Sequence, residues 1–257
     1  MEEFFDKDLL ETEYFRSLKE AYEDPNNYPF LRPYRSPDLL LDDLNSMYQY
    51  NETHAHSYAK RLKNEQKDFR NCEAIFTEII VYAYYLKLVH EGILNSLDRK
   101  EDDYDLKIEM KDGTSHFLEV FSKMPDIKIW TKEEREKGEV RACEIKTHLQ
   151  DSLGSIRQKL IEKIKKQGQM SKPRRNFAVI ELNDPRIAND FTILSSLSDG
   201  YKITIDTKNM RKIGEGFNWS KSVFDEPSLT NLVGIIYFMM GDYNHRKFIL
   251  NPNYKGV

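Results

Sequence analysis

The sequence has little cysteine and no long hydrophobic run, and these two shortages exclude several classes of protein. Its two cysteines, Cys72 and Cys143, are too few for a disulfide framework and do not form a CxxC pair. We expect both to be reduced thiols in a cytoplasmic protein. The longest apolar runs, 79–86 and 232–240, are far too short to span a bilayer, and the acidic N-terminus lacks the pattern of a signal peptide. We therefore expect no membrane partner.

The net charge and the absence of certain motifs further restrict the classes of function that the protein could have. The formal net charge is −4 over 257 residues, so any binding of nucleic acid would have to come from a local basic patch. The composition, 39% hydrophobic and 12% aromatic, is that of a globular chain. The sequence contains neither a glycine-rich phosphate loop ending in GK[ST] nor a G-x-S-x-G elbow. The sequence therefore lacks the motifs typical of P-loop proteins and of α/β-hydrolases.

Hydrophobic periodicity predicts an α/β protein with two parts. Residues 1–70 show helical spacing and loop signals without strand alternation, ending in a charged segment, 57–70, that we expect to be a solvated helix. From residue 71 onward, helices and strands are mixed. We therefore expect an N-terminal helical extension, 1–70, followed by an α/β core, 71–257, in which helices flank a central mixed sheet.

The predicted elements follow from local patterns. A nearly continuous apolar run predicts a buried helix over 71–89, and Asp112-Gly113 predicts a hairpin turn between alternating strands. The predicted helices are 8–22, 38–50, 71–89 and 151–170, and the predicted strands are 103–110, 115–122, 176–182, 201–206, 232–240 and 246–250.

Three acidic residues stand in or beside apolar segments, where an unpaired carboxylate is costly. Glu78 lies in the buried helix, Glu119 lies in an apolar strand, and Asp105 lies on the strand before it. The hairpin can bring Asp105 and Glu119 to one end of adjacent strands, where oxygen ligands suit Mg²⁺ or Mn²⁺. Such an ion activates water and stabilises the charge of a phosphoryl transition state. Asp103 competes with Asp105 as the metal ligand, and the alternative is a surface hairpin with solvated acids.

A basic segment follows the hairpin. Between residues 151 and 175 the chain has eight basic and two acidic residues. Such a patch can follow a phosphate backbone, or it can be the solvated face of an amphipathic helix. The residues that we expect to bind nucleic acid are Arg157, Lys159, Lys163, Lys166, Gln167, Lys172, Arg174 and Arg175.

Taken in order, these segments resemble the PD-(D/E)XK nucleases, the restriction-endonuclease-like superfamily. The resemblance covers residues 71–182: a helix with Glu78, the segment DLKIEMKDG that begins at Asp105, the segment FLEV that contains Glu119, a lysine-rich helix and an apolar strand. It implies a three-layer αβββαβ core and metal-dependent hydrolysis of nucleic acid, DNA being favoured over RNA, in repair, restriction or defence. It also implies that Glu78 is the helix acid, Asp105 the central metal ligand and Glu119 the acid of the (D/E)XK strand.

The sequence departs from this family at the position of the catalytic lysine, which is Phe121. Lys123 stands two residues further on and could share the face of Glu119. A lysine of the following helix could serve instead; the candidates are Lys159, Lys163 and Lys166. Without such a lysine, the chain would be an inactive member that binds nucleic acid or a protein. A third interpretation is an unrelated interaction domain, and a homodimer is left open.

Overall fold

The computed structural model describes residues 7–23, 36–100, 103–123, 156–163, 172–184 and 187–256. Within these residues, six strands form one mixed sheet in the order β1-β2-β3-β4-β7-β8, and two form a separate antiparallel pair, β5-β6. Neighbouring strands of the main sheet are antiparallel except for β3-β4 and β4-β7, which are parallel. The strands are β1 Leu94–Lys100, β2 Tyr104–Met110, β3 Ser115–Lys123, β4 Arg175–Leu182, β5 Tyr201–Asp206, β6 Arg211–Phe217, β7 Leu232–Met239 and β8 Lys247–Leu250. The α/β class and the mixed sheet predicted from the sequence are confirmed.

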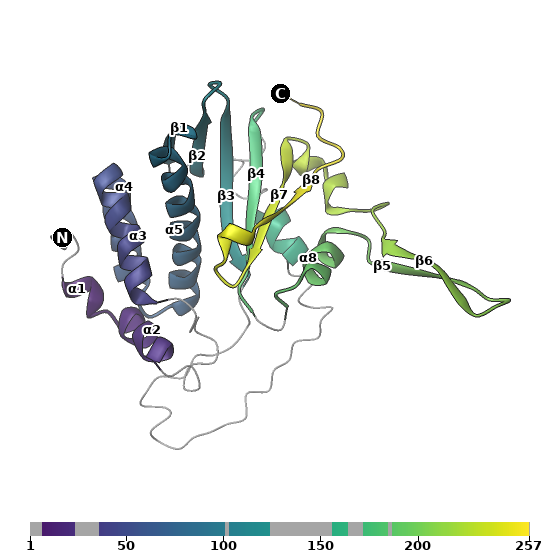
Figure 1. Ribbon diagram of the computed structural model, residues 1–257, viewed down its shortest axis with the longest axis horizontal. Coiled ribbons are helices and arrows are strands. Elements are labelled where there is room, and N and C mark those ends of the chain that lie inside the picture. The colour runs from purple at the N-terminus through teal and green to yellow at the C-terminus, as the bar shows by residue number, and fades with distance from the viewer. Residues whose placement is uncertain are drawn as a thin grey trace, which may run out of the picture.

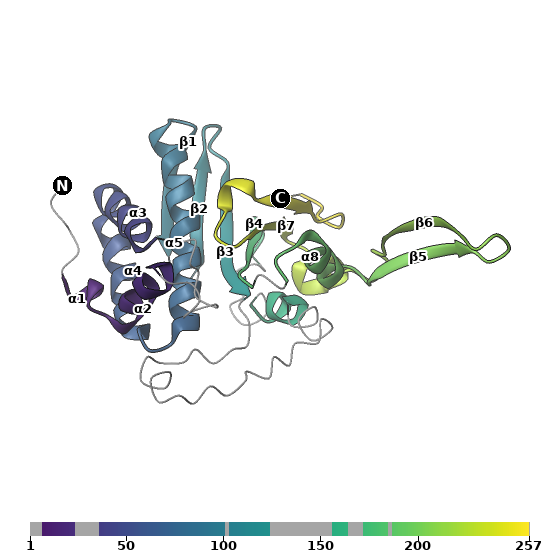
Figure 2. The same cartoon turned by 60° about the horizontal axis from the view of Figure 1, so that its bottom comes forward.

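Helices lie on both faces of the main sheet (Figure 1). One face is covered by the long helix α5, and α3 and α4 pack against α5 in turn. The other face is covered by α8 and by a helical segment at 156–163. Figure 2 shows α1 to α5 together on one side of the sheet and α8 on the other. The helices are α1 Lys7–Leu10, α2 Glu13–Glu23, α3 Pro37–Tyr50, α4 Glu52–Glu65, α5 Phe69–His90 and α8 Asp190–Leu197, and the 3₁₀ turns are η2 Val223–Asp225, η3 Pro227–Leu229 and η4 Tyr243–His245.

Each face of the sheet has its own hydrophobic core. Successive residues of a strand point to opposite faces, so Val120 of β3 packs into the first core and Phe121 into the second. The first core contains residues of α1 to α5, and the boundary predicted at residue 71 falls inside α5. Each fully buried aliphatic or phenyl side chain contributes about 1.5–3 kcal/mol. Helices α1 to α4 therefore share the core of the sheet.

Local sequence explains where several elements begin. The side chain of Ser36 accepts a hydrogen bond of 3.2 Å from the Asp38 N–H, and Pro37 occupies the first turn of α3. Asp112 accepts a hydrogen bond from the Thr114 N–H, and Gly113 has a φ of +81°, as the predicted turn between β2 and β3 requires. The helix expected over 38–50 and the hairpin of β2 and β3 are thus confirmed.

Several features differ from the prediction. The strands β1 and β6 and the helix α8 were not predicted, and the helix expected over 8–22 is divided into α1 and α2. The segment 57–70 is not a solvated helix, because α4 buries Tyr58, Ala59 and Leu62 against α5. Of the helix predicted over 151–170, residues 156–163 are helical and the rest lies outside the described residues. In the described parts of the chain, no helix is both long enough and apolar enough to cross a bilayer.

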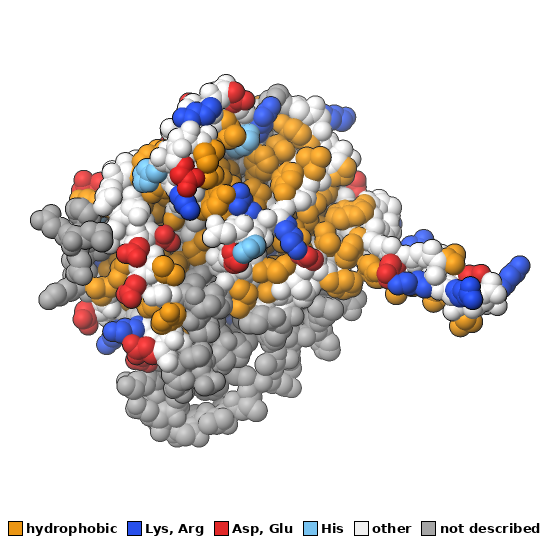
Figure 3. Space-filling view, viewed as in Figure 1, with side chains coloured by type: hydrophobic (Ala, Val, Ile, Leu, Met, Phe, Trp, Pro, Cys, Tyr) orange, Lys and Arg blue, Asp and Glu red, His pale blue; other side chains and the backbone are white. Residues whose placement is uncertain are grey.

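The hairpin of β5 and β6 projects from the body as an arm (Figures 1 and 3). Three rings join its base to α8: Phe191 lies 5.4 Å from Tyr201 and 5.6 Å from Phe217 between ring centroids. Beyond this base, most residues of both strands are exposed. In Figure 3 apolar and basic side chains are mixed along the arm.

Candidate functional site

Asp105 and Glu119 lie opposite each other where β2 and β3 begin to separate. The last pair of the ladder at this end is Leu106 with Leu118, and the two acids occupy the next step of the same register. Beyond that pair, the Asp105 carboxylate accepts a 2.7 Å hydrogen bond from the Val120 N–H, which fixes it against β3. Glu119 is buried, with 4% of its surface exposed. The structure thus brings together two of the acids predicted from the sequence.

Lys163 approaches both acids from the helical segment 156–163. Its Nζ lies 3.9 Å from Asp105 Oδ2 and 3.9 Å from Glu119 Oε2. The helix lies over β3 because Leu160 packs in the same core as Phe121. The Phe121 ring therefore packs in the core that holds the helix carrying Lys163.

Two other candidate lysines are placed differently. Lys123 is four residues beyond Glu119 on the same strand, a separation of about 13 Å along β3. Lys159 donates a hydrogen bond of 2.7 Å to the Ser122 carbonyl. Loss of hydration, and then the charges of Lys123 and Lys163, lower the pKa of Lys159 to about 8. Among the candidate lysines whose positions the structure describes, Lys163 is in contact with both acids.

The pair of acids has an excess of negative charge when both are ionised. Burial is the largest cause that raises the pKa of Glu119 to about 9, followed by the charge of Asp105, while Lys163 acts in the opposite direction. Below this pKa a proton on Glu119 compensates the second negative charge. A divalent cation would have to displace that proton in order to bind both carboxylates, and it would then supply the positive charge itself.

Glu78 lies close to this pair but is held by an arginine. Arg61 of α4 donates two hydrogen bonds to its carboxylate, from Nη1 at 2.5 Å and from Nη2 at 2.9 Å. Burial and then the charge of Asp105 raise the pKa of Glu78, and the hydrogen bond from Arg61 opposes this. This bidentate arrangement, with two parallel hydrogen bonds between oppositely charged groups, is among the strong types of hydrogen bond in proteins. Glu78 thus neighbours the site, with Arg61 as its direct partner.

Tyr58 and Arg61 are two residues at this site that the sequence did not indicate. The Tyr58 hydroxyl is buried and has no hydrogen-bond partner within the described chain. Burial, and then the charge of Glu78, raise the pKa of this hydroxyl. Helix α4 therefore contributes polar groups beside the acids.

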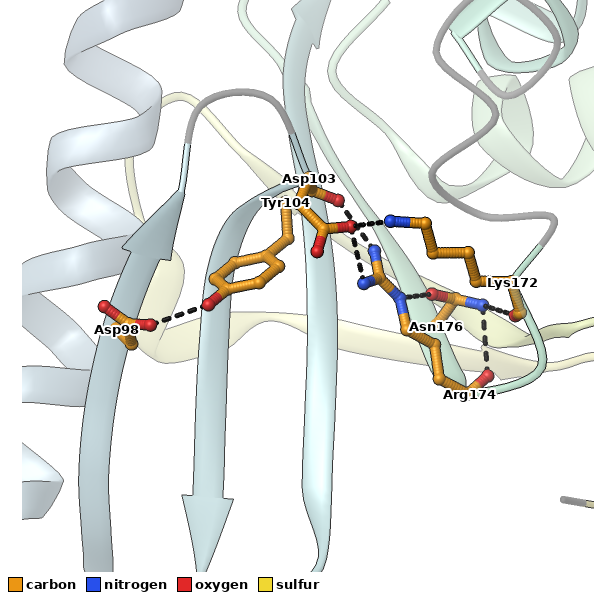
Figure 4. A network of polar contacts seen from close by, with 6 residues as sticks. All are labelled: Asp98, Asp103, Tyr104, Lys172, Arg174 and Asn176. Carbon is orange, nitrogen blue, oxygen red and sulfur yellow. Dashed lines mark hydrogen bonds and ion pairs between the residues drawn. The ribbon is translucent and has the colours of Figure 1, made fainter.

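Asp103, the competing metal ligand, belongs to a separate network (Figure 4). Its carboxylate accepts hydrogen bonds from Lys172 Nζ at 2.5 Å and Arg174 Nη1 at 2.8 Å. These bonds, that from Lys172 first, lower its pKa. Arg174 also donates to Asn176, so the network ties the start of β2 to the start of β4. The structure therefore separates the partners of Asp103 from those of Asp105.

The remaining residues of the expected nucleic-acid surface have varied surroundings. Arg157 donates to the backbone carbonyls of Lys221 and Ser222, which fastens its helix to the adjacent loop. Lys172 and Arg174 bind Asp103 as described. Arg175 is exposed at the start of β4. Lys166 and Gln167 lie outside the described residues.

A further group of buried acids lies between α5 and the end of β4. Glu73 accepts hydrogen bonds from the Tyr14 hydroxyl at 2.8 Å and from Asn183 Nδ2 at 3.0 Å. Glu181 accepts a hydrogen bond from the Thr77 hydroxyl. Because these fully buried carboxylates have hydrogen-bond donors, they join α2, α5 and β4 as a structural polar cluster.

The fit to a metal ion can be judged from the ligands present. Within the described chain, no three His, Cys, Asp or Glu side chains form a group able to hold a metal ion. Mg²⁺, however, is commonly held by one or two carboxylates, with water and substrate phosphate completing its coordination. Asp105 and Glu119 fit that requirement as a pair, provided that a substrate supplies the remaining oxygen ligands.

Comparison with known proteins leaves the function to be argued from this site. The chain matches no family model, no curated protein and no solved structure.

Proposed function

We propose that this protein is a divalent-cation-dependent nuclease of the restriction-endonuclease-like type. The observation that carries the proposal is the position of Lys163, 3.9 Å from both Asp105 and Glu119. Its substrate is nucleic acid, with DNA favoured over RNA, and its cation is Mg²⁺ or Mn²⁺. A cytoplasmic location and self-association remain predictions from the sequence.

The order of the elements supports the proposed fold. Helix α5 is followed by β1, β2 and β3, then by the helical segment 156–163, and then by β4 parallel to β3. This is the αβββαβ order that the resemblance of the sequence implies. The two acids lie where β2 and β3 separate, so the ladder between these two strands no longer continues beyond them.

Each residue of the site has a chemical role in the proposed reaction. Asp105 and Glu119 would hold the cation, which when bound lowers the pKa of water and stabilises negative charge on phosphate. The Lys163 ammonium, close to both carboxylates, orients the attacking water and stabilises charge that develops on the phosphoryl oxygens. Arg61 and Glu78 hold α4 against α5 beside these groups.

The structure also bears on the inactive alternative. That alternative depends on Phe121, whose ring can neither hold water nor stabilise charge. Because Lys163 brings an ammonium group to the two acids, the lack of lysine at position 121 is no longer an argument against catalysis. We therefore favour the enzyme over a domain that only binds nucleic acid.

The test is a cleavage assay on single-stranded, double-stranded and branched DNA and on RNA, with Mg²⁺, Mn²⁺ or EDTA. We expect cleavage with Mg²⁺ or Mn²⁺ and none with EDTA. Glu119→Gln and Asp105→Asn should abolish it, because each removes a carboxylate of the pair. Lys163→Met should lower the rate by about 10²- to 10³-fold, the loss typical of removing one electrostatic stabiliser.

Matched controls separate catalysis from general effects of substitution. Lys60→Met removes an exposed lysine of α4, and Glu109→Gln removes a partly buried acid of β2 that binds Ser96. Both variants should cleave at the wild-type rate. Absence of cleavage of every substrate with either cation, or equal rates for wild type and Glu119→Gln, would refute the proposal.

A further inference from the structure

A cavity of about 650 Å³ lies between α3, α5 and the turn that joins β7 to β8. This volume lies within the range of small-molecule sites. Its wall is mixed, with apolar and polar side chains in similar proportion. The apolar side chains of the wall include Leu39, Phe76, Ile80, Ala83, Tyr84 and Met240. The polar ones include Asp43, Ser46, Lys87, His90, Asp242 and Asn244.

One carboxylate, that of Asp43, lines this cavity without a partner. Among the described residues, it makes no hydrogen bond and no ion pair, whereas the buried acid Glu78 is paired with Arg61. Burial, and then the charge of Asp42, raise the pKa of Asp43 to about 7. Asp43 is partly buried, so water still reaches its carboxylate, and a cationic ligand in the cavity would replace that water and pair with the carboxylate.

Several cationic side chains near the cavity have other partners, and the ring of His90, which lines the cavity, contacts the ring of Tyr50 with 6.4 Å between centroids. Lys87 forms an ion pair with Glu91, its neighbour one turn away, at 3.8 Å. His245 binds Asp242 at 2.6 Å. The guanidinium of Arg246 lies 4.1 Å above the ring of Tyr84. The ring of Tyr84 thus already binds one cation, while Asp43 has none.

We propose that this cavity binds an organic cation, in which a protonated amine is attached to an apolar body of the size of a phenyl ring. The ammonium group pairs with the Asp43 carboxylate, and the apolar body packs against Phe76, Ile80 and Leu39. This site is independent of the proposed nuclease chemistry.

Isothermal titration calorimetry on the full chain with three probes tests the assignment. The probes are 2-phenylethylammonium, the anion 3-phenylpropanoate and the neutral 2-phenylethanol, which share a ring and differ in charge. We expect the ammonium probe to bind wild-type protein at least about tenfold more tightly than either other probe. Asp43→Asn should remove that preference, and it should fold well because it removes an unpaired carboxylate.

Two further variants fix the location. Asp42→Asn removes the adjacent, exposed carboxylate and should leave all three affinities unchanged. Ala83→Trp fills the cavity and should weaken all three probes. The proposal is overturned if the ammonium probe fails to bind at 10 mM, if it binds no better than the alcohol, or if Asp43→Asn binds it as tightly as wild type.

Discussion

The Arg61–Glu78 pair shows how a charged residue can be both structural and close to a reactive site. The Glu78 side chain is 7% exposed and that of Arg61 is 33% exposed. Water can therefore solvate the arginine if the pair is broken, whereas the charged acid would remain buried without its cation. A buried carboxylate that loses its only cation is strongly destabilising, whereas replacing both partners by apolar residues is often neutral. The two members of the pair should therefore differ sharply in their response to substitution.

We predict that Arg61→Met lowers the free energy of unfolding by roughly 3 kcal/mol, because it leaves the Glu78 carboxylate buried and unpaired. The double variant Arg61→Met with Glu78→Leu should recover most of that loss. Urea denaturation of the single and double variants measures both values. Lys60→Met, which removes an exposed cation from the same helix, should change the free energy by less than about 0.5 kcal/mol. A loss below about 1 kcal/mol for Arg61→Met would contradict this account of the pair.

Sequence reasoning found the acids of the site but not Arg61 or Tyr58. Asp105 and Glu119 stood out because carboxylates are rare in apolar strands, and the turn at Asp112-Gly113 fixed their register. Lys163 could be named among alternatives only, because which helical lysine reaches β3 depends on packing under Leu160. Arg61 sits in a run of charged residues, and its pairing with Glu78 depends on how α4 crosses α5. The sequence signal for burial of α4 was the pair Tyr58 and Leu62, which are four residues apart and lie on one face of the helix.

At the scale of elements, segments with long apolar runs or regular alternation were predicted from local sequence, whereas the helix α8, which has only eight residues, was missed although its sequence is apolar. The long run of α5 and the alternation of β2 identify both from local sequence alone. Strand β1 buries Leu94 and Leu97, which are three residues apart, because its pairing with β2 shifts register between Leu94 and Ser96. That spacing hides the period of two expected of a strand.

Strand β6 was missed for a different reason. It has no buried face, and it contains Gly214 and Gly216, which are weak strand formers. An isolated two-stranded hairpin is marginally stable in water, so the arm depends on the aromatic contacts at its base. The outer part of the arm should therefore contribute little to the stability of the body.

We predict that replacing residues 203–215 with an Asn-Gly turn leaves the Tm within about 2 °C of wild type. The removed residues include Ile203, Ile205 and Met210, which are each more than half exposed. The paired ends, Lys202 and Gly216, would close the shortened hairpin above its aromatic base. Scanning calorimetry measures the change. Phe191→Ala, which removes the ring that joins this base to α8, serves as the comparison and should lower the Tm more. A larger drop for the shortened arm would mean that the outer arm supports the body.

At the scale of the molecule, the site depends on chain segments that are far apart in sequence. Helix α5 supplies Glu78, the β2–β3 hairpin supplies Asp105 and Glu119, and the helical segment on the opposite face of the sheet supplies Lys163. The first core holds α5 against the sheet, and the second core holds the helical segment that carries Lys163. The convergence of these side chains is a property of the whole sheet and could not be read from any one segment.

The most direct test of the account is Mn²⁺ binding followed by electron paramagnetic resonance, with a phosphorothioate DNA duplex present to supply phosphate ligands without being cleaved. Loss of an outer-shell partner commonly weakens metal binding by about 10- to 100-fold, so loss of a ligand should do at least as much. We predict that wild-type protein binds one Mn²⁺, that Asp105→Asn and Glu119→Gln each weaken binding by at least about tenfold, and that Asp103→Asn retains it. Equal Mn²⁺ affinity for wild type and Glu119→Gln, or a loss confined to Asp103→Asn, would contradict the proposed site.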